Sequence, residues 1–345
     1  MNFGKPLTIN FIGLGHWGPI LVRAIASNPL ARVGTVCDID ETRLTLVKIY
    51  IPAVQQTSID SLATLSDPGA DAVIIATPTK THYALVKAAL DAGKHVLVEK
   101  PLTLDVGEST ELVELAHQKG LILAVGHVFL FNKGVQVVGE LIRSGELGSI
   151  NYIFATRTNL GPFRTDCNAL WDLASHDLSI INHWLEANPV SVTARGQAFL
   201  NPPIEDVVVA NYTYPGGVLA GIHASWLNPS KVRQITVVGQ KKMAIFDDMN
   251  VNAPVKVFSK SVDVQSPLQY VDSFGSFRMS IRQGDVVIPH IAGGEPVANQ
   301  LAHFIDCIMN GKSPINEAGI ALEVVRQLAS AEESMKNYST LTEIR

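Results

Sequence analysis

The first part of the chain alternates between two patterns of hydrophobic and polar positions. Five short runs are almost entirely apolar and rich in β-branched residues, which is typical of strands buried on both faces. They lie at residues 7–12, 33–37, 72–76, 95–98 and 121–125. Stretches that predict helices separate these runs, at residues 18–27, 41–50, 81–92 and 105–119. This alternation predicts a parallel sheet with crossover helices, and we expect residues 1–126 to form a doubly wound α/β domain.

The pattern changes after residue 127 and predicts a second, α+β domain over residues 127–345. Helices are expected at residues 134–143, 170–185, 296–309 and 318–337, and the last two could pack back on the first domain. Strand-like runs lie at residues 150–158, 191–200, 206–214, 218–227, 232–238 and 243–247. Pro215-Gly216-Gly217 separates two of these runs as a turn, so these two strands are expected to be antiparallel neighbours.

The composition excludes several classes of protein. The 345 residues carry a net charge of −5, so no basic excess favours a nucleic acid or an anionic membrane as partner. No apolar run reaches the roughly 18 residues of a membrane span, and the first residues lack the apolar segment of a signal peptide. Cys37, Cys167 and Cys307 are widely spaced, which fits a reducing cytoplasm and neither a disulfide framework nor a zinc ribbon. We therefore expect a cytoplasmic protein with packed cores.

A glycine-rich loop follows the first predicted strand directly and opens a predicted helix. Its sequence is Gly-Leu-Gly-His-Trp-Gly, which places Gly13, Gly15 and Gly18 in the G-x-G-x-x-G spacing. In this context Gly13 permits the tight turn, Gly15 lets the backbone approach a pyrophosphate, and Gly18 lets helix and strand pack closely. The helix N-terminus supplies N–H groups and partial positive charge for the phosphates. We expect a dinucleotide site here, with His16 and Trp17 also in contact with the cofactor.

An acid at the end of the second predicted strand strengthens this interpretation. Asp38 follows Gly18 by twenty residues, the spacing at which a carboxylate accepts hydrogen bonds from the adenosine ribose. A carboxylate there repels a 2′-phosphate, so NAD is favoured over NADP as the cofactor. Arg43 leaves NADP open, because its guanidinium could neutralise a phosphate; it could equally stack on adenine or stay solvated. The alternative is a structural glycine turn with an ordinary acid at a strand end.

Two further segments leave buried strands at their carboxyl ends, where open α/β sheets bind ligands. Thr77 and Pro78 follow the third apolar run, and Glu99 and Lys100 follow the fourth. A lysine at this place is partly desolvated and could donate to a substrate hydroxyl or lower the pKa of a nearby acid. The alternative is a surface lysine paired with Glu99.

Asp172 and His176 lie four residues apart in a predicted helix and therefore on one face. A carboxylate beside an imidazole orients the ring and raises its basicity, as a general base requires. The alternative is a capping acid and a core histidine. His183 shares this face, but at about 1.5 Å per residue it lies about 10 Å beyond His176, too far for both to bind one metal ion. No other spaced set of His and Cys offers ligands, so no metal site is expected.

Taken together, these motifs resemble the glucose–fructose oxidoreductase / inositol dehydrogenase / rhizopine-catabolism superfamily, often written Gfo/Idh/MocA. The resemblance runs over nearly the whole chain. It rests on the glycine loop, on Ala-Thr-Pro-Thr with His82, on Glu99-Lys100-Pro101 and on the Asp172–His176 pair. It extends to the closing pattern from Glu295-Pro296 through His303-Phe304 to Gly311-Lys-Ser-Pro314.

The resemblance implies a Rossmann domain for NAD, followed by a domain with an open, mostly antiparallel sheet that carries the substrate pocket. It implies that Lys100, Asp172 and His176 are the catalytic residues. It also implies a nicotinamide side of the cleft lined by Thr77, Pro78, His82, Glu99 and Lys100. The implied reaction moves a hydride between nicotinamide and a secondary hydroxyl or ketone of a sugar, sugar nucleotide or cyclitol. His176 would be the general base, Asp172 would orient it, and Lys100 would stabilise the charge on the oxygen.

A looser resemblance links the segment before Asp172 to members that act in cell-surface polysaccharide pathways, often on nucleotide-linked or amino sugars. Ser175 stands where that subgroup has proline. Five polar residues are candidate contacts for substrate hydroxyls or a phosphate: His127, Arg157, Asn159, Arg164 and Asn168. Two other functions stay open, an NAD-dependent glycosidase of the same superfamily and a non-catalytic dinucleotide-binding module.

The strands of the second domain are apolar on both faces. In the run at residues 218–227, Ile222 and Trp226 share one face, and Leu219 and Leu227 share the other. A solvated face should be clearly polar, so we expect the chain's helices to cover one face and a second copy to cover the other. The protein is therefore expected to be a homodimer or a homotetramer.

Overall fold

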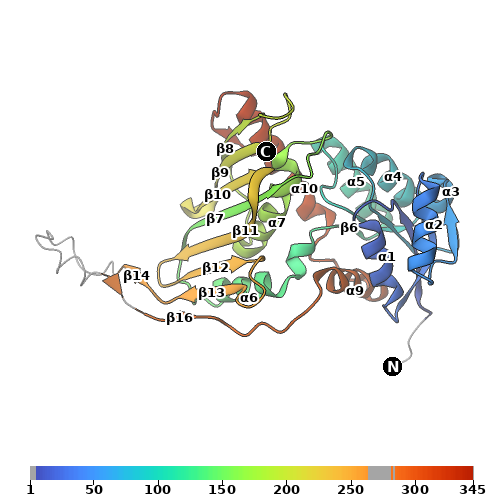
Figure 1. The fold of residues 1–345 in the computed structure, drawn as a ribbon, viewed down its shortest axis with the longest axis horizontal. Coiled ribbons are helices and arrows are strands. Elements are labelled where there is room, and N and C mark those ends of the chain that lie inside the picture. The colour runs from blue at the N-terminus through green and yellow to red at the C-terminus, as the bar shows by residue number, and fades with distance from the viewer. Residues whose placement is uncertain (1–4, 263–280, 283, 345) are drawn as a thin grey trace, which may run out of the picture. The chain divides into compact units, whose positions relative to one another are not determined.

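The computed structural model describes residues 5–262, 281–282 and 284–344, and the chain forms two compact units (Figure 1). Unit 1 comprises residues 1–131 and 294–329, and unit 2 comprises residues 132–293 and 330–345. The chain leaves unit 1 five residues after the expected boundary at residue 126. Two late helices, α9 (Pro296–Asn310) and most of α10 (Ala318–Lys336), complete unit 1.

Unit 1 contains a six-stranded parallel sheet in the order β3-β2-β1-β4-β5-β6. Its strands are β1 (Leu7–Ile12), β2 (Ala31–Cys37), β3 (Gln56–Ser58), β4 (Ala72–Ile75), β5 (His95–Val98) and β6 (Leu123–Val125). The strand order reverses at β1, between β2 and β4, and such a switch point is where open α/β sheets bind ligands. The predicted doubly wound fold is confirmed.

Helices cover both faces of this sheet. One face shares an apolar core with α1 (Gly18–Ala26), α2 (Glu41–Tyr50) and α9, in which Phe11 and Ile74 are buried. The other face is covered by α3 (Ser61–Leu65), α4 (His82–Asp91) and α5 (Val106–Lys119). The residues of β4 are therefore buried on both sides, which explains why its sequence is a continuous apolar run.

Unit 2 contains a nine-stranded sheet in the order β16-β13-β12-β11-β7-β10-β9-β8-β17. Its strands are β7 (Ile150–Leu160), β8 (Ser191–Gln197), β9 (Val207–Thr213), β10 (Leu219–Ser225), β11 (Leu227–Gly239), β12 (Met243–Asp247), β13 (Val255–Phe258), β16 (Val286–Val287) and β17 (Thr342–Glu343). A separate two-stranded sheet pairs β14 (Ser261–Val262) with β15 (Ile281–Arg282).

The pairing in the larger sheet is antiparallel except between β7 and β10, which run parallel. The turn at Pro215–Gly217 joins β9 and β10 as antiparallel neighbours. The expectation of a mostly antiparallel sheet is confirmed.

The two faces of this sheet differ. Helices α6 (Lys133–Arg143) and α7 (Ser175–Leu185) and the last turns of α10 cover one face, where Ala155 and Ile222 are buried. On the opposite face, large apolar side chains are exposed in the single chain: Tyr152, Phe154, Val209 and Leu219. Among the described residues, no helix is both long and apolar enough to cross a membrane.

Candidate active site

The glycine loop joins β1 to α1 and packs against the end of β4. Gly13 has a φ of +95°, and a Cβ there would lie 2.5 Å from the carbonyl oxygen of Ala76. A Cβ on Gly18 would lie 2.2 Å from the carbonyl oxygen of Gly13. At Gly15, by contrast, nothing lies within 4 Å of the Cβ position. The loop therefore leaves space at the glycine where a pyrophosphate would approach, just before the N-terminus of α1.

Asp38 follows β2 and turns its carboxylate toward the glycine loop. The N–H of Leu14 donates to Oδ2 over 2.6 Å, and the N–H of Asp40 donates to Oδ1 over 2.9 Å. Asp38 is only 6% exposed. The Arg43 guanidinium lies 3.7 Å from Asp38 Oδ2 and 3.2 Å from Asp40 Oδ2. Two carboxylates thus hold Arg43, and Asp38 fixes the glycine loop; that Asp38 binds the ribose stays a prediction.

An exposed apolar surface beside Asp38 was not predicted from the sequence. Ile39, directly after Asp38, is 91% exposed, and Ile59 is exposed too. Ile59 also borders an open hollow of about 490 Å³, together with Glu41, Leu44, Thr45, Lys48, Thr57 and Ser58. The available signal was an isoleucine in a polar turn, where an apolar side chain has no core to enter.

His82 is fully buried and joins two of the loops at the strand ends. Its Nδ1 lies 2.9 Å from the carbonyl oxygen of Pro101, and its Nε2 lies 3.0 Å from that of Thr77. That His82 lines the nicotinamide side stays a prediction. Its ring lies behind the surface and ties the Thr77 loop to the segment after Lys100.

Glu99, Lys100 and His127 lie at the carboxyl ends of β5 and β6. The backbone N–H of Lys100 donates to Glu99 Oε2 over 3.3 Å. Burial raises the pKa of Glu99 to about 7, although the positive charge of Lys100 opposes this shift. Burial also lowers the pKa of His127 to about 3, and Lys100 adds to that shift. The lysine therefore has near it a carboxyl group that ionises reluctantly and an imidazole that stays neutral at physiological pH.

Two buried amides hold the turn that presents His127. The carbonyl oxygen of Val125 accepts hydrogen bonds from Asn316 Nδ2 at 2.6 Å and from Gln300 Nε2 at 3.4 Å. His127 is 1% exposed, and neither of its ring nitrogens has a hydrogen-bond partner among the residues that the structure describes. Buried polar atoms are nearly always paired, so the two unpaired ring nitrogens are compatible with the prediction that His127 contacts a substrate.

The segment that carries Asp172 and His176 is not one regular helix. Asp172 lies in a π-helical turn, Leu170–Ala174, and His176 lies in the first turn of α7. The prediction of a single α-helix over residues 170–185 is wrong here, because a π turn takes up more residues than an α turn. Ser175, where proline was expected, has φ −54° and ψ −36°, so the backbone before His176 is helical.

Trp226 and Arg164 both donate to the carboxylate of Asp172. Trp226 Nε1 donates to Oδ2 over 3.1 Å, and Arg164 Nη1 donates to Oδ1 over 3.3 Å. The same guanidinium binds Asp166 through Nε at 2.9 Å and Nη2 at 2.6 Å. Both donors favour the ionised form of Asp172.

The candidate substrate contacts fall into two groups. Four of them use polar atoms inside unit 2. Arg157 forms a buried ion pair with Asp177, 2.8 Å long, and Asn168 donates to Glu205 over 2.9 Å. Arg164 binds two carboxylates, and Asn159 donates to the carbonyl oxygen of Gly161. The fifth is His127, the unpaired imidazole of unit 1.

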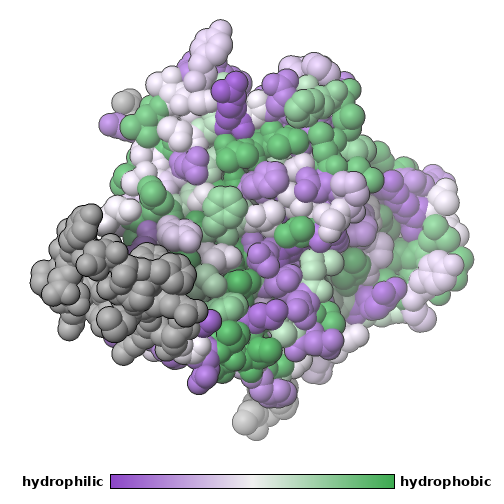
Figure 2. Space-filling view, turned by 60° about the vertical axis from the view of Figure 1, so that its left-hand side comes forward, coloured by the Kyte–Doolittle hydropathy of each residue, from purple (hydrophilic) through white to green (hydrophobic). Residues whose placement is uncertain are grey.

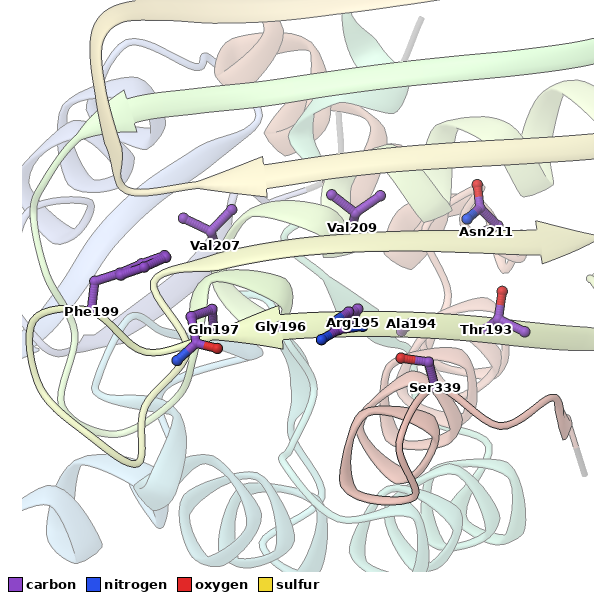
Figure 3. A pocket seen from close by; sticks show the side chains of 10 residues that line it. All are labelled: Thr193, Ala194, Arg195, Gly196, Gln197, Phe199, Val207, Val209, Asn211 and Ser339. Carbon is purple, nitrogen blue, oxygen red and sulfur yellow. The ribbon is translucent and has the colours of Figure 1, made fainter.

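An open hollow of about 570 Å³ lies on another part of unit 2 (Figure 3). Figure 3 shows Val207, Val209 and Asn211 in a row along β9, with Thr193 on the neighbouring β8. None of the predicted site residues lines this hollow. It lies on the exposed face of the sheet, because Val209 lines it and is exposed on that face. Within the described ranges, no group of three or more His, Cys, Asp or Glu is arranged to hold a metal ion.

Comparison with known proteins identifies relatives over most of the chain. The family model described as "oxidoreductase family, NAD-binding Rossmann fold" matches residues 7–127, and the GFO/IDH/MocA C-terminal domain matches residues 135–245. The UDP-N-acetylglucosamine 3-dehydrogenase of Acidithiobacillus ferrooxidans is 32% identical over 242 residues, 69% of this chain and 73% of that protein. The scyllo-inositol 2-dehydrogenase (NAD(+)) of Bacillus subtilis is 28% identical over 328 residues, 91% and 90% of the two chains.

Solved structures share the fold. The Acidithiobacillus ferrooxidans enzyme superimposes with a TM-score of 0.81 and 23% identity, covering 98% of this chain and 100% of that one. GenD2 from gentamicin A biosynthesis, solved in complex with NAD, superimposes with a TM-score of 0.82 and 22% identity. The match covers 100% of this chain and 98% of that one. The open space at Gly15 and the acid at Asp38 are compatible with NAD. The match to the NAD-binding family model and to the dehydrogenase relatives confirms the predicted cofactor and enzyme class. The chain belongs to the Gfo/Idh/MocA family of oxidoreductases and is an NAD-dependent dehydrogenase.

Proposed function

We propose that this dehydrogenase acts on a secondary hydroxyl, or the matching ketone, of a sugar, a sugar nucleotide or a cyclitol. The nicotinamide of bound NAD supplies the hydride acceptor. The observation that carries the proposal is the carboxylate of Asp172, which Trp226 and Arg164 hold four residues before His176. An ionised, oriented carboxylate is what an imidazole needs to act as a general base.

Each residue has one task in the proposed reaction. His176 takes the proton of the substrate hydroxyl, and Asp172 orients the ring and stabilises its imidazolium form. Lys100 donates to the reacting oxygen and stabilises the negative charge that develops there. His127 stays neutral, because its pKa is about 3, and offers a ring nitrogen to a substrate hydroxyl.

The names of two relatives support this range of substrates. One is a dehydrogenase of UDP-N-acetylglucosamine and the other a dehydrogenase of scyllo-inositol, a sugar nucleotide and a cyclitol. A screen of free sugars, inositols and sugar nucleotides with NAD, followed by NADH absorbance, tests the proposal. We expect turnover with at least one of these classes. Sugar release without net NADH would instead identify a glycosidase, and no turnover at all despite NAD binding would leave a binding module.

The exposed side of the sheet in unit 2 supports a homo-oligomer. Tyr152, Phe154 and Leu219 lie on one face and are exposed, next to the hollow on β8 and β9. Figure 2 shows hydrophobic side chains at the molecular surface, interspersed with hydrophilic ones. A clustered apolar face of this kind favours association, and a second copy of the chain is the proposed partner.

A further inference from the structure

We propose that Trp226 and Arg164 are positioning residues that act on His176 through Asp172. They fix the orientation of the Asp172 carboxylate and offset part of its negative charge, and that carboxylate sets the basicity of the imidazole. The inference rests on the proposed roles of Asp172 and His176. It also gives Arg164 a different task from the substrate contact that its polarity predicts.

The backbone around Trp226 is locked between two other segments. Trp226 follows β10 directly, its N–H donates to the carbonyl oxygen of Asp206 over 2.9 Å, and its own carbonyl accepts from the N–H of Gly161 over 3.0 Å. The side chain is 1% exposed. A buried indole needs a partner for its N–H, and Asp172 Oδ2 provides it at 3.1 Å. The indole therefore cannot turn away from Asp172 without losing that bond.

Arg164 is anchored on a second acid. Its Nε and Nη2 form a fork on Asp166, and the hydrogen bonds from Arg164 lower the pKa of that carboxyl group. Nη1 remains for Asp172 Oδ1. One cation thus serves two carboxylates, and its loss would leave both negative charges together.

The two donors reach different oxygens of the Asp172 carboxylate. Trp226 Nε1 donates to Oδ2 and Arg164 Nη1 donates to Oδ1, and together these bonds restrict the orientation of the carboxylate. The π-helical turn that carries Asp172 is of a kind often found at functional sites.

Several other charged groups described near α7 have partners of their own, and Glu332 accepts from Trp171 Nε1 over 2.9 Å beside the π-helical turn. Arg157 of β7 neutralises Asp177, and Arg143 of α6 acts on His183 at the far end of the helix. Around Arg157 lie Lys231 and the ion pair of Arg233 with Asp248. A variant of Arg164 or Trp226 therefore changes the electrostatics of Asp172 without removing one of these pairs.

The test is a pH titration of the His176 ring by NMR, in the full-length protein with isotope-labelled histidine. The chain has 10 histidines, and the resonance of His176 is the one missing from His176→Gln. In Arg164→Gln the lost cation should raise the titration midpoint of His176 by about one pH unit. Arg164→Lys keeps the charge and should restore most of the shift. Trp226→Phe should raise the midpoint by less and lower kcat about tenfold, with the Kd for NAD unchanged.

Trp184→Phe is the matched control. Trp184 is equally buried, lies in the same unit, and its Nε1 donates to the carbonyl oxygen of Val135 over 2.9 Å. The Trp184→Phe variant loses the same kind of indole donor and should lose similar stability. Its His176 titration and its kcat should match those of wild type.

The outcomes separate the inference from the function on which it rests. A His176 midpoint that stays within about 0.2 pH units of wild type in Arg164→Gln and Trp226→Phe would overturn the inference. So would an Arg164→Gln enzyme that only raises KM, because that result assigns Arg164 to the substrate. If the midpoints shift but wild type turns over no substrate, the positioning holds and the proposed function fails.

Discussion

Replacing Asp38 by alanine tests whether one carboxylate serves both the glycine loop and the cofactor. The buried oxygens accept from Leu14 at 2.6 Å and Asp40 at 2.9 Å. Each hydrogen bond to a charged group contributes about 1.5–3 kcal/mol, so the loss of two in Asp38→Ala should lower the free energy of unfolding by about 3–6 kcal/mol. Loss of the ribose acceptor should raise the Kd for NAD about 10- to 100-fold. The gap between NAD and NADP should narrow, because the charge that repels a 2′-phosphate is lost as well.

The assays are urea unfolding and calorimetric titration with each cofactor, and Asp40→Ala is the control. Asp40 is a half-exposed carboxylate that caps α2 by accepting from the N–H of Thr42 over 2.9 Å. Its loss should cost about 1 kcal/mol of stability and leave NAD binding nearly unchanged. An Asp38→Ala protein that loses stability but binds NAD like wild type would refute the ribose role. A wild type that prefers NADP would make Arg43 the determinant instead.

Four further predictions concern catalysis, pH dependence and assembly. Steady-state kinetics should show that His176→Ala loses about 10²–10⁴ in kcat and Lys100→Ala about 10²–10³, with both proteins folded and binding NAD. Asp172→Asn should lose less and His183→Ala almost nothing, whereas a His176→Ala enzyme within about tenfold of wild type would exclude His176 as the base. Glu99 has a folded pKa of about 7, above its ordinary 4.5, so its contribution to stability is full below pH 4.5 and is lost as the pH rises to about 7. Glu99→Gln should remove this loss in unfolding experiments across that range, and an unchanged pH profile would contradict it. His127 has a folded pKa of about 3, below its ordinary 6.5, so its contribution is lost as the pH falls from 6.5 toward 3. His127→Phe should make the protein less sensitive to acid, and equal acid sensitivity would disprove the burial argument. Light scattering at micromolar concentration should give the mass of a dimer or tetramer, and a strictly monomeric mass would argue against the sheet interface.

The central strands could be predicted from the sequence because their side chains are buried on both faces. The run at residues 95–98 is apolar at nearly every position for that reason. Short polar strands at the sheet edges could not be predicted this way. Gln56–Ser58 and Thr342–Glu343 are short and polar, and only backbone pairing with β2 and β8 places them in their sheets. The hydropathy of the side chains does not indicate such backbone pairing.

Parts of the site were predictable where the motif is local. One strand–helix–strand unit sets the spacing from the glycine loop to Asp38. Its elements β1, α1 and β2 are consecutive, so the spacing can be counted along the sequence. The surroundings of Asp172 were not predictable, because Trp226 lies 54 residues away and reaches Asp172 only through the arrangement of the sheet. Arg157 shows the same limit of sequence reasoning: polarity made it a candidate substrate contact, and burial against Asp177 makes it an internal ion pair.

The contribution of α9 to unit 1 has a consequence for the order of events during synthesis. Leu301 and Phe304 belong to the same apolar core as Leu21 and Ile25 of α1, although about 280 residues separate them along the chain. A nascent chain that has emerged as far as residue 131 therefore has every strand of the nucleotide-binding sheet but lacks part of its interior. Residues 132–293 must be synthesised before α9 can complete this core. We expect a chain truncated at residue 131 to aggregate, and the intact chain to need protection from premature contacts until translation is almost finished.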